Sequence, residues 1–249
     1  MPTESPTESH LVPNFRFSHR LRVRWSEVDM QKIVFNGHYL MYFDTAVAEY
    51  WRALALPYED AMHQLGGDLY VVKATVAYKA SARYDDRLDV AMKCARIGTS
   101  SITFEGAIYC EGKLLVTGEL VYVYADPATQ KSMPVPSQLR NIMEGFEAGA
   151  EMTHASVGDW QTLGADALRL RTEVFVQEQG VPLAMEHDEL DEGAVHLVIR
   201  NRMDAPVATA RLIQQSAGVA RIGRMAVKRV LRGSHLGAMA LQAMLDVAS

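Results

Sequence analysis

The sequence predicts an α+β fold in which an antiparallel sheet curls around one long apolar helix. Residues 15–25 alternate apolar and polar side chains with period two, which is the pattern of a half-buried strand. Residues 36–54 carry apolar side chains at helical spacing with few polar positions, which indicates a largely buried helix. Four further strand-like runs follow, and short turns separate them. One strand, one helix and four strands on short connections make up an α+β arrangement.

The end of this first domain is marked by turn residues and a closing helix. The four strand-like runs cover residues 70–82, 88–97, 101–110 and 114–124. Prolines at 127, 134 and 136 end the sheet. Residues 137–146 then have the pattern of a short helix, with Ser137 as its expected N-cap.

Composition divides the chain into four parts. Residues 1–14 contain the repeat PTESPTES and too little apolar content to fold, so we expect a disordered tail. Residues 15–146 form the first domain. Residues 147–159 mix Gly, Ala, Ser and charges without periodicity and are expected to be a linker. Residues 160–249 form a second domain, for which we expect a helix, three strands and a final helix. These segments cover residues 165–179, 194–200, 207–214, 220–227 and 236–249.

Charge and composition exclude several functional classes. The 249 residues are 49% hydrophobic and 22% charged, which is typical of a globular protein and not of a disordered one. The formal net charge of −5 does not indicate a nucleic-acid-binding protein. Cys94 and Cys110 lack metal-ligand spacing, and two lone cysteines favour a reducing compartment. Neither a basic, apolar leader nor an apolar run of membrane length is present. We therefore expect a cytoplasmic protein that binds no metal, nucleic acid or membrane.

The connection between the first strand and the long helix has a pattern suited to chemistry. Asp29 lies seven residues before Asn36, the expected first residue of the helix. First-turn N–H groups of a helix have no partner within it and carry partial positive charge, so they polarise a carbonyl or hold an oxyanion. The alternative interpretation is purely local, with Asp29 as a turn residue and Asn36 as an N-cap.

The same residues resemble a known enzyme family. Asp29, the run IVFNGHY at 33–39 and the helix end EYWR at 49–52 are similar to the 4-hydroxybenzoyl-CoA thioesterase family of hotdog-fold acyl-CoA thioesterases. The resemblance covers residues 15–146. One departure is that Gln31 and Lys32 replace the glycine that usually follows the aspartate.

This resemblance implies roles for particular residues. Asp29 would be the nucleophile or general base, and the backbone N–H at Asn36 would polarise the thioester carbonyl. The remaining implied positions are Gly37, His38 and Tyr39 for substrate binding, and Thr99 and Ser100 for the CoA nucleotide. For His38 a structural, hydrogen-bonded role is the alternative, and the segment with Thr99 and Ser100 is also an ordinary hairpin turn.

The implied function is hydrolysis of an acyl-CoA thioester to a free acid and CoA. The resemblance implies no cofactor, because CoA is part of the substrate, and it implies a homodimer or homotetramer formed through this domain. A second hypothesis is an acyl-CoA sensor or interaction module that binds without turnover. An aspartate facing a thioester favours the enzyme over this pure binding role.

The second domain resembles another superfamily, the GNAT N-acetyltransferases. The carrying segments are Arg171 with VFVQEQGVP at 174–182, ATARL at 208–212, GRMAV at 223–227 and RGSHLGA at 232–238. By resemblance, Met225, Val227, Arg232, Gly233 and Gly237 would bind acetyl-CoA, with the pyrophosphate on the backbone N–H groups of a helix start.

Two features of this second resemblance limit what we expect of it. His235 stands where the family has a small residue, and the family continues beyond the segment that corresponds to the final helix. We expect a partial GNAT-like domain without acetyl transfer. A bifunctional thioesterase and acetyltransferase is the alternative if the natural chain is longer.

Two charged runs in the second domain have alternative interpretations. The acidic run at 186–192 is either a solvated loop or a field that attracts an amine substrate. Basic residues at 221–232 either surround an anion site at the phosphate turn or form a solvated strand edge.

Overall fold

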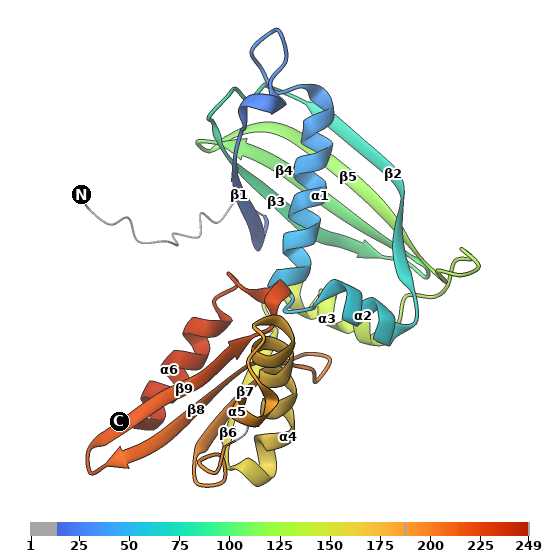
Figure 1. Cartoon of the computed structure of the whole chain (residues 1–249). Coiled ribbons are helices and arrows are strands. Elements are labelled where there is room, and N and C mark those ends of the chain that lie inside the picture. The colour runs from blue at the N-terminus through green and yellow to red at the C-terminus, as the bar shows by residue number, and fades with distance from the viewer. Residues whose placement is uncertain (1–13, 187, 249) are drawn as a thin grey trace. The chain divides into compact units, whose positions relative to one another are not determined.

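The computed structural model describes residues 14–186 and 188–248, which form two compact units (Figure 1). The first unit contains the described residues up to Trp51 and Met62–Ala150. The second contains Arg52–Ala61 and the described residues from Glu151 onward. Apart from Asn14, the tail expected at residues 1–14 lies outside the described residues.

The first unit is built on a five-stranded antiparallel sheet. Its strands lie in the order β1-β3-β4-β5-β2. They are β1 (Phe17–Arg22), β2 (Asp68–Tyr78), β3 (Arg87–Ile97), β4 (Ser101–Cys110) and β5 (Lys113–Ala125). Each strand overlaps one of the runs expected from the sequence, so the predicted α+β class is confirmed for this unit.

The helices of this part of the chain are α1 (Asn36–Ala53), α2 (Tyr58–Leu65), α3 (Ser137–Glu147) and a 3-10 turn (Trp25–Glu27). Helices α1 and α3 begin where the sequence analysis expected a helix to begin. Two local expectations are wrong. The N-cap of α3 is Pro136 rather than Ser137. Trp25 is exposed, because β1 ends at Arg22 and the strand alternation does not continue to it.

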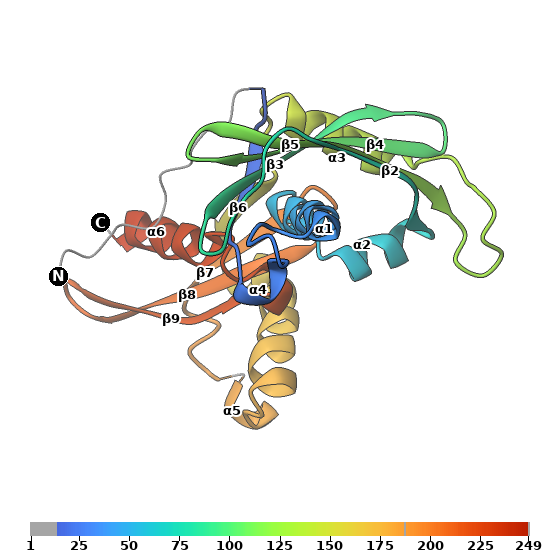
Figure 2. The ribbon, with the colours of Figure 1, turned by 90° about the horizontal axis from the view of Figure 1, so that it is seen from above.

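Helix α1 lies in the concave face of the arched sheet (Figure 2). Phe43 of this helix is fully buried against two glycines, Gly106 of β4 and Gly118 of β5, which are cross-strand partners. A Cβ atom at either glycine would lie 2.5 Å from the Phe43 ring, well inside van der Waals contact. The missing side chains therefore set the depth at which α1 packs on the sheet.

Strand β2 forms one edge of this sheet. Within the described residues it pairs with β5 alone, and its other edge has no strand partner. Its exposed side chains include Val71, Val72 and Tyr78. An apolar edge strand of eleven residues offers unpaired N–H and C=O groups for pairing with another chain.

The second unit contains a four-stranded antiparallel sheet in the order β6-β7-β8-β9. Its strands are β6 (Thr153–Gly158), β7 (Val195–Asn201), β8 (Pro206–Ser216) and β9 (Val219–Val227). Helices α4 (Trp160–Arg171) and α6 (Leu236–Ala248) pack on it, and a π-helical turn (Thr172–Glu178) and α5 (Leu183–Glu186) follow α4.

Strand β6 corrects the expected linker at residues 147–159. Glu147 is still the last residue of α3, and β6 pairs with β7 from Thr153 opposite Asn201 to Gly158 opposite His196. Its sequence THASVG has no apolar alternation, and its pairing partner lies about forty residues later. Only the pairing with β7 therefore identifies the segment as a strand.

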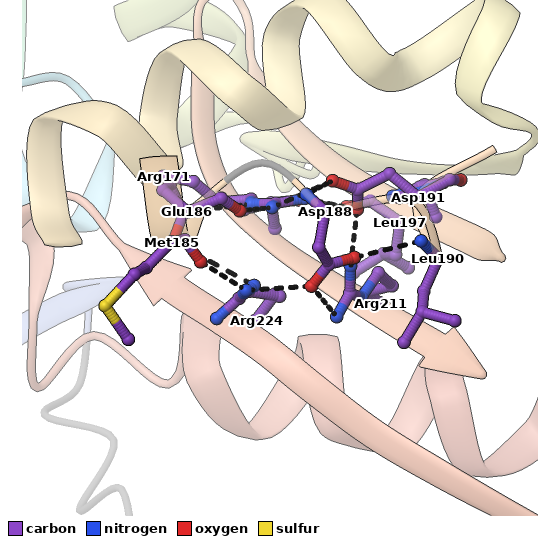
Figure 3. Close-up of polar contacts among 11 residues, drawn as sticks. Arg171, Met185, Glu186, Asp188, Leu190, Asp191, Leu197, Arg211 and Arg224 are labelled. Carbon is purple, nitrogen blue, oxygen red and sulfur yellow. Dashed lines mark hydrogen bonds and ion pairs between the residues drawn. The ribbon is translucent and has the colours of Figure 1, made fainter. Parts of the chain in front are cut away.

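The acidic run at 186–192 is solvated only in part, because Glu189 and Glu192 are exposed whereas Glu186 and Asp191 are buried. Three of its carboxylates pair with three arginines in the charge cluster, defined as Arg171, Glu186, Asp188, Asp191, Arg211 and Arg224 (Figure 3). Arg171, on α4, donates from Nε to Glu186 and from Nη1 to Asp191 at 2.8 Å. All three of these side chains are buried.

Strands β8 and β9 complete the charge cluster. Arg211 donates to Asp188 at 2.6 Å and to Asp191 at 2.7 Å, and Arg224 donates to Asp188 at 2.9 Å. Burial alone would raise the pKa of Asp191, but hydrogen bonds from Arg171 and Arg211 outweigh it and lower the pKa to about 2. The cluster joins α4, α5 and the following loop to the sheet with balanced charge.

Two absences can be stated for the described part of the chain. None of its helices combines the length and the apolar character needed to cross a membrane. It also contains no group of three or more His, Cys, Asp or Glu side chains placed to hold a metal ion.

Both cysteines are free thiols. Burial, together with the neighbouring Glu147, raises the pKa of Cys94 to about 12, so this thiol is protonated at neutral pH.

The first unit should fold without the second. A fragment of residues 1–150 contains the five-stranded sheet and α1, whose core is Phe43 and its neighbours. We expect a soluble fragment with a cooperative thermal transition by circular dichroism. An insoluble or non-cooperative fragment, with the full chain folded, would contradict this prediction.

Breaking the charge cluster should strongly destabilise the second unit. Arg171→Met leaves Glu186 and Asp191 buried without their main partner, which typically costs about 3–5 kcal/mol. The control is Arg169→Met on the same helix, whose side chain is 64% exposed and pairs with Asp166. An exposed pair contributes about 1 kcal/mol or less. Urea-dependent hydrogen exchange of β7 amides measures both variants, and equal losses would refute a special role for the cluster.

Acid should weaken the same unit. The folded-state pKa of Asp191 is about 2, below the value near 3.9 expected for an unfolded chain. Its contribution to stability is therefore complete above about pH 4 and is lost as the pH falls through about 2. The exchange protection of β7 should follow this window, and protection that is constant down to pH 2 would contradict it.

Candidate functional site

Asp29 lies in a short hairpin between the 3-10 turn and α1. Val28 and Val34 form its bridge, and the Asp29 N–H donates to the Ile33 carbonyl at 2.9 Å. Lys32 has φ +62°, a left-handed conformation that favours glycine. The departure noted in the sequence is therefore accommodated, because Lys32 adopts the backbone conformation that a glycine would take more easily.

The carboxylate of Asp29 has a local role as well as an exposed face. Its Oδ1 accepts a hydrogen bond from the Gln31 N–H at 2.8 Å, so the turn-residue interpretation is correct for one oxygen. Among the described residues, no hydrogen bond engages Oδ2. Asp29 is partly buried, and this second oxygen is available to a ligand.

The start of α1 is held by groups distant in the sequence. Helix α1 begins at Asn36, as predicted. The Val34 N–H donates to the Ala82 carbonyl at 2.9 Å, and the Tyr78 hydroxyl donates to the Asn36 carbonyl at 3.1 Å. These bonds hold the start of α1 in place. The His38 N–H donates to the Phe35 carbonyl at 2.9 Å, whereas the N–H groups of Asn36 and Gly37 have no partner within the helix.

Asp29 and Asn36 line one open cavity of about 420 Å³. The other lining residues are Gln31, Ile33, Val34, Phe35, Tyr39, Tyr78, Lys79, Ala80 and Ser81. The hairpin supplies one wall, and the end of β2 with the residues after it supplies the other. The structure therefore brings together the carboxylate and the helix start that the sequence analysis paired.

Tyr39 is the one expected substrate-binding residue that lines this cavity. Its side chain is 2% exposed, and its hydroxyl accepts a hydrogen bond from the Ala82 N–H at 2.8 Å. Burial raises the pKa of Tyr39, so the phenol remains neutral at physiological pH. It offers an aromatic wall rather than a charge.

Gly37 and His38 do not line the cavity in the part of the chain described. Gly37 follows Asn36 in the first turn, and a Cβ atom there would lie 3.0 Å from the Phe35 ring. The His38 ring lies edge-on to Phe35 with centroids 6.0 Å apart, and its Nδ1 is buried without a hydrogen-bond partner. The contact with Phe35 is a packing contact, and the unpaired Nδ1 does not match the hydrogen-bonded role given as the alternative for this histidine.

Thr99 and Ser100 lie at the other end of the sheet. They form the turn before β4, which begins beside Val123 of β5, whereas Tyr78 at the cavity pairs with Val116. Seven residues of extended strand separate these two positions, or roughly 24 Å. One chain therefore does not bring this turn to the cavity of Asp29.

A second cavity, of about 330 Å³, lies within the second unit. All five residues expected to bind acetyl-CoA line it, namely Met225, Val227, Arg232, Gly233 and Gly237. The other lining residues are Val174, Gln179, Ala226, Leu231 and Leu236. His235, expected to narrow this site, is exposed and is not part of the lining.

Arg232 already has a carboxylate partner in this cavity. Its two Nη atoms donate to the two oxygens of Glu178, both at 2.7 Å. These hydrogen bonds lower the pKa of Glu178 and raise that of Arg232. Gly233 has φ +85°, a conformation that explains the glycine in the turn before α6.

Several site residues were not predicted from the sequence. Tyr78, Lys79 and Ser81 end an expected strand, and only sheet packing places them beside residues 29–36. Glu178 belongs to a π-helical turn expected to be ordinary helix, and its pairing with Arg232 spans 54 residues. No local pattern identifies either relationship.

Comparison with known proteins is consistent with this geometry. The model of the thioesterase-like superfamily matches residues 23–143. A "Putative esterase" of Aquifex aeolicus is 30% identical over 95 residues, or 38% of this chain and 73% of that protein. The acyl-CoA thioester hydrolase YbgC of Escherichia coli is 27% identical over 120 residues, or 48% of this chain and 89% of that protein.

Solved structures similar to this chain are also known. A Thermus thermophilus thioesterase, crystallised with coenzyme A and Zn, has a TM-score of 0.49 at 21% identity and is matched over 56% of this chain and 99% of that one. The superfamily match and the alignment with the Aquifex relative each cover less than half of the chain. Through residues 23–143, the chain belongs to the thioesterase-like superfamily.

Proposed function

We propose that the first unit hydrolyses acyl-CoA thioesters to a free acid and CoA. The observation that carries the proposal is the shared cavity, in which the Asp29 carboxylate and the first turn of α1 face the same space. The Escherichia coli relative named as an acyl-CoA thioester hydrolase supports the same reaction class. The cavity supplies a nucleophile or base and an oxyanion site, the two requirements of acyl transfer.

The chemistry assigned to these groups follows from charge. The thioester carbonyl oxygen lies against the N–H group at Asn36, where the start of α1 stabilises the negative charge that develops on it. Asp29 either attacks the carbonyl carbon or removes a proton from an attacking water. The C–S bond then breaks, CoA leaves as a thiolate that takes up a proton, and water contributes the second oxygen of the acid.

A pure acyl-CoA binding module is the competing function. It would use the cavity without bond cleavage, and an ionised carboxylate beside a neutral thioester would then add desolvation cost without benefit. The free Oδ2 of Asp29 in the described structure therefore favours turnover.

The complete site is proposed to need a second copy of the chain. The turn with Thr99 and Ser100 lies at the far end of the sheet from Asp29, and β2 presents an open apolar edge. Antiparallel pairing of two β2 edges would extend the sheet and bring the far end of one copy toward the cavity of the other. This arrangement supports a homodimer or a homotetramer.

A second proposed function concerns the cavity of the second unit, which we propose binds CoA. Its apolar wall suits a pantetheine arm, and Arg232 with the start of α6 suits a phosphate group. Glu178 accepts hydrogen bonds from the guanidinium of Arg232, so a phosphate group would have to displace it.

Asp29→Asn should abolish most hydrolysis without loss of the fold. The amide keeps the shape of the carboxylate but is neither nucleophile nor base, so kcat should fall by about a hundredfold or more. The control is Asp44→Asn, an exposed α1 residue outside the cavity. Thiol release from a panel of acyl-CoAs measures both. Hydrolysis by Asp29→Asn at the parent rate would leave Asp29 as a turn residue only.

Two substitutions at the second cavity should change CoA binding in opposite directions. Glu178→Gln frees Arg232 and should tighten binding, whereas Arg232→Ala removes the phosphate partner and should weaken it by about tenfold. CoA-dependent hydrogen-exchange protection of the first turn of α6 reports this site separately from the first unit. Arg229→Ala, outside the lining, is the control. Parent chain whose α6 gains no protection would reject CoA binding here.

A further inference from the structure

A buried carboxylate, Glu27, lies next to the catalytic hairpin but outside the cavity. It is the last residue of the 3-10 turn and is 7% exposed. It does not line the space that Asp29 and Asn36 share. A carboxylate is costly to bury unless hydrogen bonds satisfy it, so its partners indicate why it is there.

The partners of Glu27 belong to both sides of the site. Its Oε2 accepts from the Tyr42 hydroxyl at 2.8 Å and from the Arg24 N–H at 2.7 Å. Its Oε1 lies 3.4 Å from the Nε of Arg24, whose guanidinium is exposed. Its own backbone carbonyl accepts from the Phe35 N–H at 2.9 Å.

These bonds join the base of the hairpin to α1. Glu27 precedes Val28, the first bridge residue of the hairpin, and Phe35 follows Val34, the last. Tyr42 lies six positions after Asn36 on α1 and is itself buried. A displacement of Glu27 would therefore move the hairpin that carries Asp29 relative to the helix that carries the oxyanion site.

The direction of the bond between the two side chains is well defined. Burial, with the hydrogen bond to Glu27, raises the pKa of Tyr42 well above its usual range. The phenol therefore keeps its proton and remains the donor, and the 2.8 Å contact is a hydrogen bond between two buried side chains.

We propose that Glu27 is a positioning residue, and that the Glu27–Tyr42 pair holds Asp29 at its working distance from the first-turn N–H groups of α1. This inference rests on the proposed hydrolysis. Glu27 touches neither substrate nor reacting atoms, and its effect on the rate passes entirely through Asp29. A misplacement of about 1 Å in such a geometry costs up to about a hundredfold in rate.

The same helix provides a matched control for a purely structural contribution. The Tyr50 hydroxyl donates to Glu147 at 2.5 Å, so α1 contains a second buried tyrosine paired with a glutamate. This pair lies two turns farther along α1, and within the described residues no hydrogen bond joins it to the hairpin. Tyr50→Phe removes a comparable bond, so it reports the loss of stability without the loss of positioning.

The experiment measures kcat, KM and hydrogen exchange for Glu27→Gln, Tyr42→Phe, the double variant and Tyr50→Phe in the full chain. At a temperature where all are folded, kcat should fall about tenfold for each change at the pair, with KM within about twofold. The double variant should lose little more than the worse single variant, because both changes break one bond. Tyr50→Phe should stay within about twofold of the parent.

A second arm tests whether the effect passes through Asp29. In an Asp29→Asn background, Glu27→Gln should leave the residual rate unchanged, because there is no carboxylate left to position. Without substrate, the Asp29 and Phe35 amides should exchange faster in Glu27→Gln and Tyr42→Phe, and not in Tyr50→Phe.

The outcomes separate this inference from the proposed function. A parent chain without thioester hydrolysis overturns both. A hydrolysing parent whose kcat is unchanged by Glu27→Gln and Tyr42→Phe overturns the positioning role alone. An equal loss of kcat in Tyr50→Phe also overturns it, because the effect would then be one of stability. If Glu27→Gln does not fold, Tyr42→Phe, which removes a single hydroxyl, decides by the same criteria.

Discussion

The packing of Phe43 on the paired glycines Gly106 and Gly118 is the constraint on which the first unit depends. No side chain separates the ring from the sheet there, so α1 lies deep in the concave face and its rotation is set. Close packing of this kind transmits position along a rigid helix. The start of α1 at Asn36, two turns earlier, therefore has a defined place relative to the strand ends around it.

The candidate site combines one local structure with several distant contacts. The hairpin of Asp29 forms through bonds between neighbours, and it needs a strained Lys32 to close. Its placement depends on Ala82, Tyr78 and the Glu27–Tyr42 bond. Tyr39 and Tyr78 are the tyrosines that line the cavity, and Asp29 and Lys79 are the charged residues among those that line it. The carboxylate and the helix start therefore lie in one cavity with a single cationic neighbour, Lys79.

In the second unit, unlike in the cavity of Asp29, most of the buried charged side chains pair with one another. Three carboxylates of its acidic run form ion pairs with Arg171, Arg211 and Arg224. These pairs join α4 to β8 and β9. Arg224 has φ +49°, so the cluster holds a strained residue directly before Met225 in the wall of the second cavity. Burying charged pairs of this kind costs desolvation free energy. In this unit the pairs fix the path of the backbone and do not form a charged surface for a ligand.

The sequence by itself determined the elements of the first unit and the pairing of Asp29 with Asn36, because periodicity and helix-start chemistry are local properties. The resemblance in the second unit also selected five residues that line one cavity, on β9, the turn after it and the start of α6. Only the tertiary structure decided three features. They are strand β6, the burial of Glu186 and Asp191 in the acidic run, and the contacts of Glu27. Each depends on partners many residues away, and a local pattern has no information about which distant group will satisfy a strand edge or a buried charge.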